Sequence, residues 1–110
     1  MRRAVPLLAL ALAPAFVAVS AQPAAARTAR VVIEDIDFTP GTVRIHRGDR
    51  VRWVWRDGIT PHDVTSRGRH RFRSSRTKSS GSHRVRFRHR GTYRYVCTIH
   101  LGMDGKVVVR

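Results

Sequence analysis

The sequence predicts an all-β protein, an antiparallel sandwich of two sheets with Greek-key connections. Three observations support this fold class. After residue 26, apolar and polar residues alternate in several short runs, with the period of two that is typical of half-buried strands. Glycine, proline and aspartate interrupt these runs at close intervals, as turns require. The same region shows no helical periodicity, so a sandwich of short strands is the expected architecture.

The expected strands follow one another along the chain with a turn signal between each pair. They comprise residues 31–38, 43–45, 51–56, a short extended piece at Val64, an edge strand at 69–73, and the runs 83–89, 93–97 and 106–109. The turn and loop signals are Thr39-Pro40-Gly41, His46–Asp49, Asp57-Gly58, the loop Ser74–Ser82, and Gly91. The residues expected between the two sheets are Val31, Ile33, Val43, Ile45, Val51, Trp53, Val85, Phe87, Tyr95 and Val108.

Residues 1–26 have the pattern of a secretory signal peptide. Arg2 and Arg3 precede an apolar run over residues 7–19, and small residues follow it. Cleavage is expected either after Ala21 or after Ala26, because each is preceded by small residues at the required spacing. Residues 27–110 would then form one domain, exported to a periplasm, to the cell surface or to the medium.

The alternative for the same segment is an uncleaved membrane anchor. The apolar run is shorter than the ~20 residues that a membrane helix needs, and Pro6 and Pro14 interrupt it. We therefore expect no stable membrane insertion after cleavage. No cysteine stands near the cleavage region, which argues against a lipid-anchored protein.

The chain is strongly basic, with 22 Lys and Arg against 7 Asp and Glu and a formal net charge of +15. No carboxylate occurs between Asp63 and Asp104. A nucleic-acid interface is one interpretation of such a surplus. However, arginines alternate with other residues at strand period over residues 83–90, as on a solvated sheet face. No nucleic-acid motif accompanies them, so we expect no nucleic-acid partner. A third interpretation is a basic surface that steers an acidic partner protein.

Sulfur-containing residues are few, and they stand at the spacing of metal ligands. Cys97 is the only cysteine, and Met103 is the only methionine besides Met1. Together with His100 they form the motif Cys-x-x-His-x-x-Met, and His62 lies upstream after a proline. Two imidazoles, one thiolate and a weak thioether form the ligand set of an electron-transfer copper site. A single thiol in an exported domain cannot form an intramolecular disulfide, and metal ligation would keep it from oxidation.

Each of these residues taken alone has an ordinary explanation. A buried cysteine is usually a small apolar residue, and a lone methionine usually fills a core. The joint pattern on an exported β chain favours ligation instead. The other histidines, His46, His70, His83 and His89, stand in turns or basic stretches and are expected at the surface. Zinc could also occupy such a site and would leave the protein colourless.

From Val31 to Arg110 the chain resembles the cupredoxins, or type 1 blue copper proteins, and most of all the amicyanins within the plastocyanin group. The resemblance rests on Phe38-Thr39-Pro40, Gly48–Trp53, Pro61-His62-Asp63-Val64, Gly91–Thr98 and Met103–Val109. It implies one copper ion per chain, bound by His62, Cys97, His100 and Met103. It also implies that Tyr93 is the family's tyrosine-corner residue.

Asp63, Thr98 and Ile99 are the residues expected to surround and support the ligands. Asp63, Ile99 and also Leu101 depart from the family pattern. Asp63 stands where the family usually has asparagine, and a carboxylate accepts hydrogen bonds but cannot donate one, so a weaker link between the ligand loops is expected. Ile99 and Leu101 occupy positions that are often proline. Their N–H groups could donate to the Cys97 sulfur, which would favour Cu(I) and raise the reduction potential.

The function expected from this reading is that of a soluble, monomeric one-electron carrier and not of an enzyme. The ring edge of His100 would be the exit for the electron, inside an apolar docking rim formed by Ile59, Pro61, Leu101 and Gly102. Redox partner proteins with an acidic docking surface are expected. The alternative is an extracytoplasmic copper-delivery protein, although delivery sites favour exchangeable Met- or His-rich ligands. A structural relic without copper or a basic adhesion module is a further alternative, and a dinuclear copper site is excluded by the single cysteine.

Overall fold

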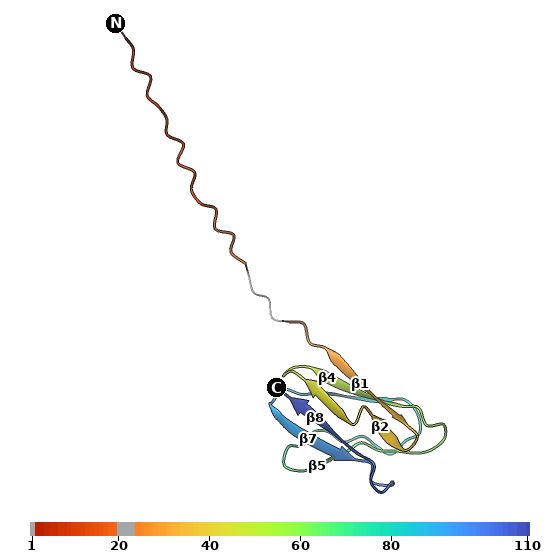
Figure 1. Ribbon diagram of the computed structural model, residues 1–110. Helices are drawn as coiled ribbons and strands as arrows, with labels where there is room; N and C mark the ends of the chain where they lie inside the picture. Colours follow the sequence, from red (N-terminus) through yellow and green to blue (C-terminus); the bar gives the residue numbers. More distant parts are fainter. Residues whose placement is uncertain (1, 20–23) are drawn as a thin grey trace.

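The computed structural model describes residues 2–19 and 24–110, and in these ranges the chain forms eight strands (Figure 1). The strands are β1 (Thr28–Glu34), β2 (Asp37–Thr39), β3 (Thr42–Ile45), β4 (Arg50–Trp55), β5 (Thr65–Arg67), β6 (Ser82–Arg86), β7 (Gly91–Val96) and β8 (Asp104–Val109). Residues 2–19 are exposed and extend away from the strands. Among the described residues no helix is long and apolar enough to cross a membrane. The expected cleavage point after Ala21 lies outside the described residues.

The strands form two four-stranded sheets packed face to face, which confirms the all-β sandwich. One sheet has the order β2-β1-β4-β6 and the other β3-β8-β7-β5. Each sheet is mixed and not purely antiparallel, because β1 runs parallel to β4 and β3 runs parallel to β8. Parallel neighbours need a connection that crosses to the other sheet, and here the connection from β1 to β4 passes through β3 of the second sheet.

The first expected strand, residues 31–38, is two strands in the structure. Asp35 and Ile36 have positive φ angles of 52° and 54°, and they form the two-residue turn of a β1–β2 hairpin. The carboxylate of Asp57 accepts hydrogen bonds from the N–H groups of both turn residues at 3.1 Å. This distant carboxylate supports a backbone conformation that an isoleucine rarely adopts, and for this reason the local pattern did not reveal the turn.

The edge strand expected at residues 69–73 is not present in the structure. The strand at this edge is β5, and the following segment is irregular. Serine side chains take over the hydrogen bonds: Ser66 Oγ accepts from Phe72 N–H at 3.1 Å, and Ser74 Oγ accepts from Ser66 N–H at 3.0 Å. Side-chain hydroxyls of this kind compete with sheet pairing.

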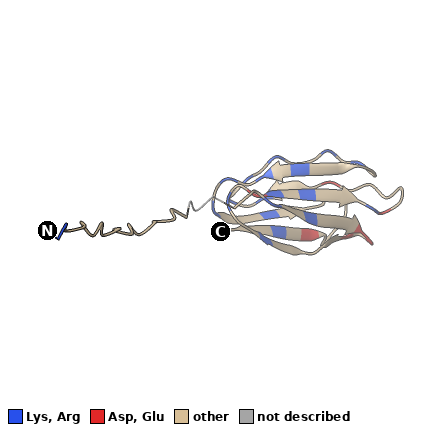
Figure 2. Ribbon diagram, turned by 90° about the horizontal axis from the view of Figure 1, so that it is seen from above, with Lys and Arg blue, Asp and Glu red and all other residues tan. Residues whose placement is uncertain are grey.

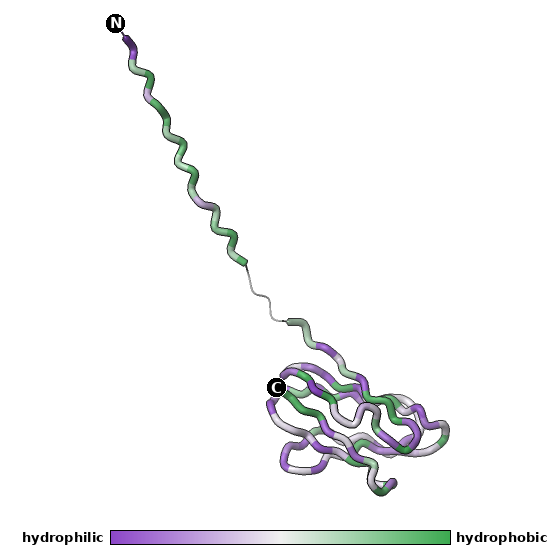
Figure 3. The backbone as a smooth tube through the Cα atoms, in the orientation of Figure 1, coloured by the Kyte–Doolittle hydropathy of each residue, from purple (hydrophilic) through white to green (hydrophobic). Residues whose placement is uncertain are grey.

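The core is formed by apolar residues of both sheets. Figure 3 shows how hydrophobic and hydrophilic stretches follow one another along the chain. Most of the expected core residues are buried, and Val85 is partly buried against the cluster. Val108 is a correction, because Val107 and Val109 point inward instead, with 0% and 4% of their surfaces exposed. Successive side chains of a strand face opposite sides, so a shift of one residue reverses the faces of the whole strand β8.

The tyrosine corner implied by the family resemblance is present. The hydroxyl of Tyr93 donates a hydrogen bond of 2.9 Å to the carbonyl oxygen of His89. Further along β7, Tyr95 is fully buried against Gly105 of β8, where an added Cβ would lie 2.5 Å from the tyrosine ring. This close approach fixes the end of β7, from which Cys97 and the loop after it continue.

Candidate metal centre

One side of the candidate centre is formed by the segment after β4. His62 is fully buried, and its backbone forms a two-way bridge with Lys78: each N–H donates to the other's carbonyl, at 2.9 and 3.0 Å. The indole N–H of Trp55 also donates to the His62 carbonyl at 3.0 Å, and the Lys78 ammonium lies 4.5 Å from the Trp55 ring centre. The backbone of His62 is therefore held by three hydrogen bonds, two with Lys78 and one from Trp55.

The other side is the loop that joins β7 to β8. The Cys97 N–H donates to the Met103 carbonyl at 2.9 Å, and the Met103 N–H donates to the His100 carbonyl at 3.3 Å. Gly102, with a φ of 78°, allows the chain to close this tight loop. The side chains of Cys97 and Met103 are each only 3% exposed, while His100 is partly exposed.

The two segments bring three ligand atoms together. The Cys97 sulfur lies 3.4 Å from Nδ1 of His100 and 3.9 Å from Nδ1 of His62, and the two imidazole rings are 4.6 Å apart between centres. His62, Cys97 and His100 are the only group of at least three such residues within ligand distance in the described part of the chain. Met103 lines the same hollow as Cys97 and His100. His46, His70, His83 and His89 lie outside this group.

The Asp57 carboxylate, which the sequence reading did not select, fixes the orientation of His62. Its Oδ2 lies 2.7 Å from Nε2 of His62, which leaves Nδ1 directed toward Cys97. The hydrogen bond with His62, followed by the N–H of Ile36, lowers the pKa of Asp57 below its ordinary value. A carboxylate on the outer nitrogen of a ligand histidine is a common device of metal sites. In the sequence, the one indication of this contact is that Asp57 stands five residues before His62.

Asp63 links the two ligand segments. Its carboxylate accepts hydrogen bonds from the Thr98 N–H at 3.1 Å, from the Thr98 hydroxyl, and from the Thr65 hydroxyl. Burial raises the pKa of this carboxyl, but the hydrogen bonds from Thr65 and Thr98 lower it more, so the pKa lies below its ordinary value. The carboxylate accepts from every group that it contacts here, and the expectation that its link is weaker than that of an asparagine stays a prediction.

The Cys97 sulfur accepts one backbone N–H among the described residues, from Asp63 at 3.5 Å. Neither Ile99 nor Leu101 donates to it in that part of the chain. The donors on which the raised reduction potential was expected to depend are therefore not in place. The N–H that does reach the sulfur comes from the residue after His62, in the opposite segment.

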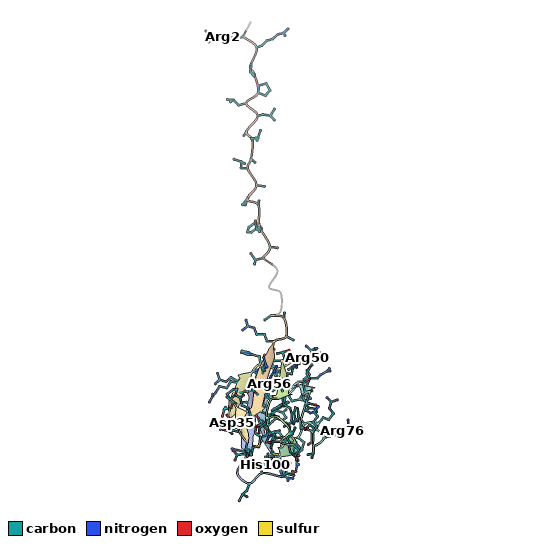
Figure 4. The ribbon with its side chains drawn as sticks, turned by 90° about the vertical axis from the view of Figure 1, so that its right-hand side faces the viewer. Arg2, Asp35, Arg50, Arg56, Arg76 and His100 are labelled. Atoms are coloured by element: carbon teal, nitrogen blue, oxygen red, sulfur yellow. The ribbon has the colours of Figure 1, made fainter. Side chains whose placement is uncertain are left out.

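The surface beside these residues is apolar and projects outward. Leu101 is fully exposed, Ile59 is 94% exposed and Ile99 is 48% exposed, with Pro61 and Gly102 also at the surface. Among the described residues, none of these exposed side chains belongs to the core cluster or packs against it. Figure 4 shows His100 at the end of the domain opposite to the point where the N-terminal segment joins it.

The donor set fits copper. Two imidazole nitrogens and one cysteine sulfur at these separations, with a thioether in the same hollow, suit both a soft monovalent and a borderline divalent ion. Calcium and magnesium would require oxygen ligands, which this cluster does not present. Burial of the sulfur also keeps the thiol from solution oxidants.

A protein of this fold with a buried His-Cys-His cluster at one end is a cupredoxin, and comparison with known families agrees. The model of the cupredoxin-like domain matches residues 7–109, so the chain belongs to this family.

Two similar curated proteins are amicyanins. Amicyanin-alpha of Methylorubrum extorquens is 34% identical over 92 residues, covering 80% of this chain and 76% of its own. Amicyanin of Paracoccus versutus is 32% identical over 83 residues, covering 72% of this chain and 62% of its own. A solved reduced Cu(I) form of an amicyanin variant superposes with a TM-score of 0.67 at 28% identity, over 76% of this chain and 82% of that one. Copper is therefore the cofactor of this chain.

Two further structures show how widely the fold is shared. A purple cupredoxin from Nitrosopumilus maritimus has a TM-score of 0.67 at 23% identity and covers 74% of this chain and 99% of its own. A copper-containing nitrite reductase from Thermus scotoductus has a TM-score of 0.69 at 25% identity, but the match spans only 25% of that chain. The shared part of the reductase is thus a domain of the size found here.

Proposed function

We propose that the domain of residues 27–110 is an exported, monomeric carrier of single electrons, and not an enzyme. The observation that carries this proposal is the convergence of the Cys97 sulfur with Nδ1 of His62 and His100 at one end of the sandwich. Similarity to amicyanins over most of the chain supports the same class. The residues 1–26 act as the secretory signal that takes the domain to a periplasm or to the cell exterior.

In this proposal His62, Cys97, His100 and Met103 bind one copper ion, which supplies a centre that can gain and lose one electron. The chain keeps the ligands nearly still. His62 is held by Asp57 on its ring and by Lys78 and Trp55 on its backbone. The link from Asp63 to Thr98 ties the two ligand segments to each other. Ligands that do not move lower the reorganisation that electron transfer requires.

The ring of His100 provides the exit for the electron. His100 is the one partly exposed member of the cluster, and Ile59, Pro61, Leu101 and Gly102 surround it with exposed apolar surface. Electron-transfer complexes bury small areas, below about 1,200 Å², and dissociate quickly. A small apolar rim around one imidazole edge suits a contact of this kind.

The charge distribution indicates which partners this end would receive. Six of the seven carboxylates belong to the β1–β2 turn or to the segments around the metal ligands, and Figure 2 shows the acidic positions gathered mostly away from the C-terminus. Arg84, Arg86 and Arg88 are exposed along β6 and beyond it, on the flank of the sandwich. We propose redox partners that place an apolar spot against His100 and acidic groups against this basic flank. Their electron-transfer rate should fall as salt is added.

The proposed function is tested by loading the purified protein with Cu(II) and recording its absorption spectrum alongside its metal content. We expect one copper per chain and an intense blue or purple band that bleaches on reduction. Cys97→Ser should remove the band. His70→Gln, an exposed histidine outside the cluster, is the matched control and should keep it. A copper-replete protein without the band would overturn the proposal. Rapid exchange of copper with slow exchange of electrons would point to copper delivery instead.

A further inference from the structure

A buried carboxylate lies at the end of the sandwich opposite to the metal centre. Asp49 is in the turn between β3 and β4 and is only 8% exposed. Its Oδ1 accepts the N–H of Arg27 and its Oδ2 accepts the N–H of His46, each at 2.9 Å. These two N–H groups, that of Arg27 first, lower the pKa of Asp49 below its ordinary value, so the carboxylate is ionised at neutral pH.

Among the described residues no lysine or arginine side chain reaches within 4.0 Å of this carboxylate, although the side chains of His46 and Arg27 lie near enough to lower its pKa further. Among the described residues the one carboxylate with a basic side-chain nitrogen within 4.0 Å is Asp57, beside His62. A buried charge is costly unless a hydrogen-bonded counter-charge accompanies it. Asp49 therefore lacks a cation in direct contact, and a charged group closer than these side chains would stabilise its carboxylate.

Arg27 is the point at which the chain becomes part of the folded domain. Its carbonyl accepts the N–H of Arg50 at 2.8 Å, and β1 begins at the next residue. Ala24, Ala25 and Ala26 are exposed, and none of the hydrogen bonds among the described residues involves them. Figure 1 shows residues 2–19 lying away from the strands. The run Ala24-Ala25-Ala26 also supplies the small residues that a signal peptidase requires before its cleavage point.

We propose that the signal peptide is removed between Ala26 and Arg27, and that the α-ammonium group created at Arg27 becomes the counter-charge of Asp49. The inference rests on the export that the proposed function includes. Hydrolysis consumes one water: the C–N bond between the two residues breaks, Ala26 takes the hydroxyl as a carboxylate, and the nitrogen of Arg27 becomes an ammonium.

The geometry for this ion pair exists before cleavage. The nitrogen of Arg27 already lies 2.9 Å from the carboxylate, so cleavage changes its charge without moving it. An ammonium–carboxylate hydrogen bond is about twice as strong as one from a neutral N–H. Processing after Ala26 therefore stabilises the exported domain, whereas cleavage after Ala21 would leave five residues attached and place the new charge elsewhere.

The first test is the N-terminal residue of the protein exported by a bacterial host, read by mass spectrometry and N-terminal sequencing of the unmodified full chain. We expect the mature protein to begin at Arg27. A mature protein that begins at Gln22, or one that keeps residues 1–26, would overturn the inference. The copper spectrum of the same sample reports on the proposed function separately, because the metal centre lies at the other end of the domain (Figure 4).

The second test is the pKa of the α-ammonium group, measured by NMR titration of the mature domain. An ordinary α-amine titrates near ~7.7–8.0, and the ion pair should raise this pKa by about one unit. Because the folded-state pKa is raised, the added stability is present below the unfolded value and is lost as the pH rises through the folded value. Asp49→Asn should return the pKa to its ordinary range. Glu34→Gln, at the far end of β1, is the control and should leave it raised. Equal pKa values in the wild type and Asp49→Asn would refute the ion pair.

Discussion

The link between the two ligand segments depends on one buried carboxylate, and its removal gives a stability change that can be calculated from the structure. Asp63 is 3% exposed and accepts three hydrogen bonds, from the Thr98 N–H, the Thr98 hydroxyl and the Thr65 hydroxyl. A hydrogen bond to a charged group contributes about 1.5–3 kcal/mol. The two hydroxyls can rehydrate in part when Asp63 is absent, so Asp63→Ala should lower the free energy of unfolding by about 3–6 kcal/mol.

The assay is urea denaturation of the metal-free protein under a reductant, followed by far-UV circular dichroism. The free energy of unfolding of a small domain is about 5–15 kcal/mol, so the loss should appear as a large shift of the urea midpoint. Thr98→Val removes one hydroxyl donor and keeps the backbone donor, so it should cost about 1–2 kcal/mol. Asp63→Asn keeps an acceptor oxygen, so its loss of stability should lie between those of Thr98→Val and Asp63→Ala. If the free energy of unfolding of Asp63→Ala lies within about 1 kcal/mol of the wild-type value, the carboxylate does not hold the two segments together.

Three further predictions follow from other contacts. Gly105→Ala places a Cβ 2.5 Å from the buried ring of Tyr95 and should destabilise the domain by about 1–3 kcal/mol in the same assay. Gly41→Ala is the control and should be nearly neutral, because its Cβ would meet nothing nearer than 3.9 Å. Equal effects of the two substitutions would contradict the packing at β7 and β8. Asp57→Asn removes the charge that orients His62 and should weaken Cu(II) binding by about 10–100-fold, measured by competition with a chelator. Asp35→Asn at the same end is the control and should leave the affinity unchanged. An unchanged affinity in Asp57→Asn would show that the 2.7 Å contact between Asp57 and His62 is not needed. The pKa of Asp49 is lowered in the fold, so the stability it adds is present above the unfolded value of about 3.9 and is lost as the pH falls through the folded value. The advantage of wild type over Asp49→Asn should therefore shrink in denaturation experiments below about pH 4, and a constant difference would count against this assignment.

The metal centre was predictable because ligand chemistry is encoded in residue types and short spacings. Cys97, His100 and Met103 lie within one loop, so their proximity follows from the sequence almost directly. His62 required the additional assumption that two loops meet at one end of a sandwich. Its burial and its contact with Cys97 agree with that assumption.

The features that sequence reasoning missed depend on contacts between distant segments. The β1–β2 turn is supported by Asp57, which lies more than twenty residues away, and the same carboxylate orients His62. The inward face of β8 depends on pairing register, and an apolar run such as Val107–Val109 fits either face. The hydrogen bonds of the segment 69–73 depend on serine hydroxyls that compete with sheet pairing.

The most direct measurement of the central claim is a crystal structure of the copper-loaded protein. Our account predicts one ion bound by the sulfur of Cys97 and by Nδ1 of both His62 and His100, with the Met103 sulfur as a more distant fourth ligand. Copper bound through the exposed histidines, with the Cys97 sulfur turned away from both imidazoles, would contradict it.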